Sequence, residues 1–189
     1  MCMPASPKDR HAKWLARSAA RRRREMVSNE NAAAGLIASF PDELTQTHVA
    51  GFAPIGDEID LWPLLQHLRD TGRIIGLPVT GAKPSPLTFR RWTDNCEMAC
   101  DKYGIQFPKD GDIITPQLIL LPLLAFTARG DRLGYGGGYY DRTLSNLRIS
   151  GDIFACGVAY AGQEVDDLPT DEHDQSLDGI LTEAGFRRF

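Results

Sequence analysis

The sequence predicts an α/β fold with three layers, in which a largely parallel sheet lies between helices. Segments typical of strands alternate with segments typical of helices along most of the chain. One segment, 117–126, is apolar on both faces, as expected of a central strand covered by helices on each side. A chain of 189 residues suits one domain, so we interpret 1–189 as a single domain whose residues 1–10 form a tail that can be disordered.

The first half of the chain begins with a basic segment rich in good helix formers, and Ser28 after it is a residue type that caps a following helix. A β-branched, apolar segment that ends at Pro54 and Gly56 has the composition of a strand. Pro63 suits the first turn of the next helix, and Gly72 suits its end. The predicted helices cover 8–27, 29–40 and 58–72, and the predicted strands cover 47–55, 74–79 and 87–92.

The second half is weakly patterned at first. Residues 94–116 show no clear period, so we predict mostly loop with room for a turn of helix. The apolar segment 117–126 then leads into a glycine-rich loop and a helix over about 139–147. The last strands are expected at 153–161 and near 177–182, and no internal repeat is present.

Composition and charge exclude several classes of protein. A net charge of −4 gives no overall attraction to nucleic acid or to anionic membranes. No apolar run reaches the roughly 18 residues of a membrane span. The four cysteines form no CxxC pair and no signal peptide is visible, so we expect reduced thiols in a cytoplasmic protein. Nothing in the sequence points to an obligate protein partner.

The segment RLGYGGGYYDR, residues 132–142, contains glycine at positions 134, 136, 137 and 138. Glycine loses the most conformational freedom on ordering, so a bare backbone at this place needs a function. Loop N–H groups and the positive end of the following helix together form the general phosphate site of α/β proteins. The spacing matches neither the dinucleotide motif GxGxxG nor a Walker A loop, because Tyr139 replaces the third glycine and no Gly-Lys-Ser/Thr follows.

Two charged residues beside this loop extend the interpretation. Arg132 supplies a cation of the kind that pairs with phosphate oxygens. Asp141, one turn into the helix, is placed to reach a Mg²⁺ that the phosphates also bind. The alternative is a flexible hairpin whose aspartate merely complements the helix dipole. From the residues alone, the sequence predicts an anion site and little more.

At 124–142, LAFTARGDRLGYGGGYYDR, the sequence closely resembles the signature of the 5-formyltetrahydrofolate cyclo-ligase family. The resemblance extends from the basic N-terminal helix to DEHDQSLDGILTE at 171–183. It implies a Rossmann-like α/β fold related to the CoA-transferase and ribose-isomerase group. It also implies a reaction that uses ATP and Mg²⁺ to convert 5-formyltetrahydrofolate into 5,10-methenyltetrahydrofolate, ADP and phosphate. The formyl oxygen attacks the γ-phosphate, and N10 of the folate then closes the ring as phosphate leaves.

The resemblance further implies which residues bind each ligand. Those implied for ATP are Lys13, Arg17, Arg132, Leu133, Gly134, Tyr135, Gly136, Gly137, Gly138, Tyr139 and Tyr140. Those implied for the folate are Ala53, Glu58, Tyr135, Gly136, Gly137, Gly138 and Tyr139. Asp141 and Asp174 are implied for Mg²⁺. No side chain is assigned as a catalytic nucleophile, because phosphoryl transfer depends chiefly on positioning and charge.

Each of these residues also has an ordinary explanation. Lys13 and Arg17 lie four residues apart, so they share one helix face. Without the resemblance, that face is explained as a solvated basic surface. Glu58 is also an ordinary acidic residue at a helix N-terminus, and Asp174 also fits an acidic surface loop. The neighbouring run Arg21–Arg24 is interpreted as a solvated face or weak anion patch. Three aromatic residues are left without a role: Phe89, Trp92 and Tyr103.

The chain departs from the family pattern at a few positions. Gln106 and Phe107 stand where the family often has Glu-Pro, and Leu123 stands where a glycine is usual. Two other functions therefore stay open: a family relative that acts on a different small molecule, and a non-catalytic regulator that binds folate or nucleotide. An NAD(P) enzyme is disfavoured by the missing third glycine.

Overall fold

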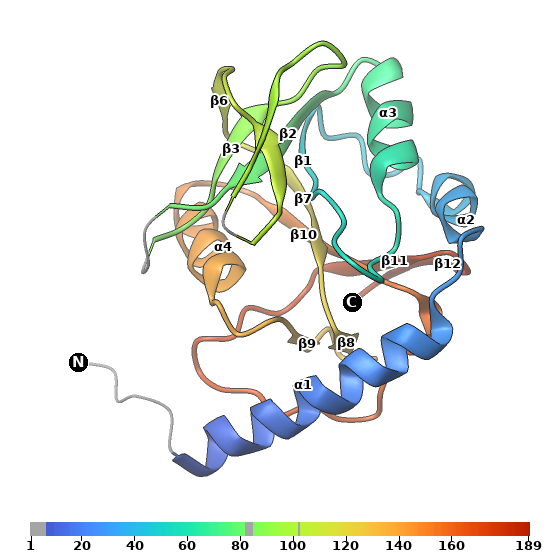
Figure 1. Cartoon of the computed structure of the whole chain (residues 1–189), viewed down its shortest axis with the longest axis vertical. Coiled ribbons are helices and arrows are strands. Elements are labelled where there is room, and N and C mark those ends of the chain that lie inside the picture. The colour runs from blue at the N-terminus through green and yellow to red at the C-terminus, as the bar shows by residue number, and fades with distance from the viewer. Residues whose placement is uncertain (1–6, 82–84, 102) are drawn as a thin grey trace.

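A central sheet organises the computed structural model, which describes residues 7–81, 85–101 and 103–189 (Figure 1). Within these residues the sheet has eight strands. From one edge to the other they are β12 (Gly185–Arg188), β11 (Gly179–Thr182), β10 (Phe154–Val158), β7 (Leu118–Pro122), β1 (His48–Ala50), β2 (Ile74–Val79), β3 (Thr88–Arg91) and β6 (Ile113–Ile114). The strands from β11 to β2 run parallel, and the outer strands β12, β3 and β6 are antiparallel to their neighbours.

Helices cover both faces of this sheet. On one face lie α2 (Ala32–Ser39) and α3 (Trp62–Asp70), and on the other lies α4 (Tyr139–Ser150) (Figure 1). Side chains of β7 alternate between two separate cores: Leu120 packs with α2 and α3, whereas Ile119 packs with Leu144 of α4. The predicted fold, with three layers and a largely parallel sheet, is confirmed. Its relation to the CoA-transferase group stays a prediction.

The longest helix, α1 (Pro7–Val27), belongs to neither layer and crosses the molecule at the end where two short strands lie (Figure 1). These strands, β8 (Ala125–Phe126) and β9 (Arg132–Leu133), pair with each other outside the main sheet. Ala20 of α1 packs against Leu124 and Leu133 in a small third core. No described helix is long and apolar enough to cross a membrane.

Several element boundaries match the prediction and others correct it. Strand β2 covers the predicted residues, and α4 begins at the predicted residue. The predicted strand 117–126 is broken instead: β7 ends at Pro122, and a turn at 127–131 reverses the chain between β8 and β9. Proline has no N–H to continue the ladder, which explains the break. The glycine loop therefore follows a hairpin and not the central strand itself.

The other corrections concern short elements and chain ends. Asn31, not Ser28, precedes the first turn of α2, while the Ser28 hydroxyl donates to the Glu25 carbonyl at the end of α1. The predicted helix 58–72 begins only at Trp62. Helix α1 begins at Pro7, inside the expected tail, and residues 1–6 lie outside the described residues. The region predicted as loop contains β6 and the paired strands β4 (Met98–Cys100) and β5 (Gln106–Pro108).

Candidate functional site

A cavity of about 350 Å³ opens where the parallel strands end. Residues that follow β1 and β2, and the last residue of β7, line it, as expected of ligand sites in open α/β sheets. Helix α1 and the glycine loop complete its wall. Every residue implied by the resemblance lines this one cavity: Lys13, Arg17, Ala53, Glu58, Arg132, Leu133, Gly134, Tyr135, Gly136, Gly137, Gly138, Tyr139, Tyr140, Asp141 and Asp174.

The glycine loop needs glycine for conformation and for space. Gly136 and Gly138 have φ of 89° and 65°, in the left-handed region that side chains disfavour. A Cβ at Gly136 would lie 3.0 Å from Cζ of Arg17. Gly138 precedes the first turn of α4, and no side chain caps that turn. The N-terminus of α4 lies at the cavity, and the helix dipole favours an anion there.

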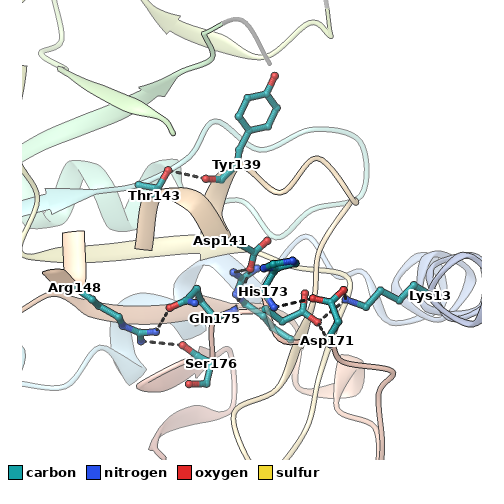
Figure 2. A network of polar contacts seen from close by, with 11 residues as sticks. Lys13, Tyr139, Asp141, Thr143, Arg148, Asp171, His173, Gln175 and Ser176 are labelled. Carbon is teal, nitrogen blue, oxygen red and sulfur yellow. Dashed lines mark hydrogen bonds and ion pairs between the residues drawn. The ribbon is translucent and has the colours of Figure 1, made fainter. Parts of the chain in front are cut away.

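Helix α1 directs two basic side chains into this cavity. Arg17 donates from Nε to the carbonyl of Gly134, with a separation of 3.0 Å. Lys13 is only 9% exposed, and its Nζ lies 2.8 Å from Oδ2 of Asp171 and 2.5 Å from Oδ2 of Asp174 (Figure 2). Burial opposes the charge on Lys13, but the hydrogen bonds to both aspartates outweigh it and raise its pKa. The alternative of a solvated basic face is therefore wrong for Lys13.

A second cation–carboxylate pair lies at the start of α4. Arg132, 8% exposed, reaches Oδ1 of Asp141 from Nη2 at 2.5 Å, and the backbone N–H of Gln175 donates to the same oxygen. The Nε of Arg132 is buried and has no hydrogen-bond partner in the described part of the chain. A buried donor without a partner is uncommon and indicates a missing acceptor. An anion in the cavity would supply one.

The carboxylates suit Mg²⁺ that is shared with phosphates. Asp141 and Asp174 both line the cavity. Asp141 pairs with Arg132, and Asp174 pairs with Lys13 (Figure 2 shows Asp141 and Lys13). Within 7–81, 85–101 and 103–189, no cluster of three or more His, Cys, Asp or Glu forms a metal cage. Mg²⁺ commonly takes one or two carboxylates together with substrate phosphates and waters. This donor set fits that mode of binding.

Glu58 also lines the cavity. Its side chain is only 5% exposed, and Oε2 accepts a hydrogen bond from the N–H of Ile55 at 2.9 Å. The hydroxyl of Tyr135, from the glycine loop, donates to Oε1. Burial raises the pKa of Glu58, and it raises the pKa of Tyr135 as well. Ala53, which is buried, leaves room in the wall nearby.

One residue of the site was missed. Arg24 was interpreted as solvated together with its neighbours, but it is 5% exposed while residues 21–23 are exposed. It contacts Asp57 and Tyr135. The available signal was helical spacing, because Lys13, Arg17 and Arg24 recur at intervals that return to one face. Among the unassigned aromatic residues, Tyr103 lines the cavity, whereas Phe89 and Trp92 belong to the core.

Comparison with known proteins agrees with this geometry. The 5-formyltetrahydrofolate cyclo-ligase of Escherichia coli K12 is 32% identical over 156 residues, which cover 79% of this chain and 85% of that protein. The Haemophilus influenzae enzyme of the same name is 34% identical over 140 residues, covering 71% of this chain and 74% of that protein.

A solved structure shares the whole architecture. The 5,10-methenyltetrahydrofolate synthetase of Aquifex aeolicus superposes with a TM-score of 0.74 at 28% identity, covering 93% of this chain and 92% of that one. The sequence profile of the 5-formyltetrahydrofolate cyclo-ligase family matches residues 8–183, nearly the full length. The chain belongs to the 5-formyltetrahydrofolate cyclo-ligase family.

Proposed function

We propose that this protein converts 5-formyltetrahydrofolate into 5,10-methenyltetrahydrofolate at the expense of ATP, in the presence of Mg²⁺. Family membership supports the activity. The observation that carries the detailed reaction is the convergence of a glycine loop, two cation–carboxylate pairs and a buried glutamate on one cavity. Its small-molecule substrates require neither nucleic acid nor a membrane, and we propose that it acts in the cytoplasm.

In this proposal the triphosphate of ATP lies along the glycine loop. The loop N–H groups and the start of α4 bind phosphate oxygens, and the free Nε of Arg132 donates to one of them. Lys13 and Arg17 neutralise the remaining charge from the side of α1. Asp141 and Asp174 would hold Mg²⁺, which supplies charge neutralisation between the phosphates during transfer. Fixed charges of this kind need no reorganisation as the reaction proceeds.

Two of the three predicted phosphate cations are each paired with a predicted metal carboxylate. Lys13 contacts Asp174, and Arg132 contacts Asp141. These pairs keep the buried charges compensated until the nucleotide arrives, which avoids the large penalty of an isolated buried charge. We propose that each carboxylate then turns toward the metal while its cation turns toward phosphate.

The folate would occupy the end of the cavity near Glu58. The carboxylate of Glu58 is an acceptor for pterin N–H groups, and Tyr103 adds an aromatic wall. The formyl oxygen then faces the last phosphate near the loop 135–139. Attack of that oxygen on phosphorus and closure by N10 need no protein nucleophile, only two substrates held in line.

The proposal is tested by following the absorbance of the methenyl product after mixing the protein with 5-formyltetrahydrofolate and Mg·ATP. We expect product only when ATP is present, together with equal amounts of ADP and phosphate. Binding of folate or nucleotide without turnover would instead identify a regulator. No binding of folate, with ATP hydrolysis on another small molecule, would identify a relative with a different substrate.

A further inference from the structure

Arg24 is a buried arginine that does not itself line the cavity. Its side chain is 6% exposed, although it ends a run of four arginines whose other members are exposed. Removing a guanidinium from water is unfavourable unless partners compensate the charge.

The partners of Arg24 come from two different segments. Its Nη2 lies 2.5 Å from Oδ1 of Asp57, which follows β1. Its Nη1 donates to the hydroxyl of Tyr135 in the glycine loop, and the guanidinium lies 5.6 Å from the centre of the Tyr135 ring. The same Nη1 is 3.6 Å from Oε1 of Glu58. One guanidinium therefore joins α1, the segment after β1 and the loop.

Arg24 lies behind the residues that would meet a ligand. Glu58 and Tyr135 line the cavity, whereas Arg24 and Asp57 do not. An effect of Arg24 on a ligand must therefore pass through those two side chains. We propose that Arg24 is a positioning residue of the folate site: it fixes the Glu58 carboxylate and the Tyr135 hydroxyl in the orientation that receives the pterin. This inference rests on the proposed function.

Charge supports the same assignment. The groups that face Glu58 are Arg24 from α1, Asp57 beside it, Tyr135 from the loop and Tyr140 from α4. Burial raises the pKa of Glu58, and Arg24 is the one cation among these groups that opposes the rise. Together with the hydrogen bonds from Tyr135 and from the Ile55 N–H, Arg24 favours the ionised form of Glu58, which is the form that accepts hydrogen bonds from pterin N–H groups.

Two substitutions separate geometry from charge. Arg24→Gln removes both, and Arg24→Lys keeps the charge but loses the planar fork that reaches two partners. We expect the KM for 5-formyltetrahydrofolate to rise roughly tenfold or more in each, as for loss of a charged hydrogen bond, while the KM for ATP changes little. Loss of the cation in Arg24→Gln raises the pKa of Glu58 further. As the pH is lowered, Glu58 is then protonated at a higher pH than in the wild type, and folate affinity is lost at that higher pH. Arg24→Lys leaves that pH dependence near the wild-type one.

Controls make the test decisive. Arg23→Gln, in the exposed neighbour, should leave both KM values unchanged. If Arg24→Gln does not fold, Asp57→Asn disturbs the guanidinium from outside the cavity and should still raise the folate KM selectively. The wild type is assayed first, because absence of product there overturns the proposed function itself. If the wild type is active and these variants lose thermal stability with unchanged folate KM and pH profile, Arg24 is merely structural and the inference is wrong.

Discussion

Replacing Gly137 with valine is expected to weaken ATP binding and turnover by about 100-fold, comparable to the loss of a preorganised oxyanion donor. Gly137 lies between the two left-handed glycines but does not itself have a positive φ, so the backbone can accept a side chain there. A Cβ would lie 3.0 Å from Cδ2 of Tyr139, so a larger side chain requires the Tyr139 ring or the loop, both of which line the cavity, to shift. Calorimetric titration with ATP and a turnover assay measure the loss.

The matched control is Gly151→Val at the opposite end of α4. No heavy atom lies within 4 Å of a Cβ built at Gly151, and its φ of 169° is extended backbone. This variant should bind ATP as the wild type does. If Gly137→Val folds, as judged by circular dichroism and thermal unfolding, and still binds and turns over ATP normally, the glycine loop does not hold the triphosphate.

The second large effect is expected for Asp141→Asn. The neutral amide is a poorer ligand for a hard cation, so the Mg²⁺ concentration that gives half-maximal activity should rise by about 100-fold, at the upper end of losses seen around metal sites. Asp174→Asn should act in the same direction. Initial rates across a Mg²⁺ titration at saturating ATP and folate measure the shift.

An aspartate remote from the cavity provides the comparison. Asp152→Asn alters an exposed carboxylate beyond the end of α4 and should leave the Mg²⁺ dependence unchanged. Asp141 also pairs with Arg132. If Asp141 only orients the Arg132 side chain, Asp141→Asn should give a different result. In that case the KM for ATP would rise while the Mg²⁺ requirement stayed the same, and Asp141 would not be a metal ligand.

The fold was predictable where a segment carries its own pattern. Strand β2 is continuously apolar and is largely buried between β1 and β3, so its residues identify it. Strands β4, β5 and β6 have only two or three residues each, too few for a period to emerge. Their formation depends on tertiary pairing, for example of β6 with β3. Such pairing is not visible in a single sequence.

The residues of the candidate site were likewise predictable only in part. The glycine–tyrosine segment is specific enough for the resemblance to supply residues from across the chain, and all of them line one cavity. Their roles as ligands stay predictions until a complex is measured. Arg24 was missed because a run of identical charges conceals which member faces inward. Helical spacing places Arg24 on the face of Lys13 and Arg17, and the packing of α1 buries that face.

The pair between Lys13 and Asp174 joins positions 161 residues apart in the chain. Contacts of such high sequence separation form late, since most of the chain must be ordered first. Lys13 lies on α1, before every strand of the sheet, whereas Asp174 lies after β10. Loss of α1 would therefore remove the cation that pairs with Asp174 while leaving every strand of the sheet in the chain.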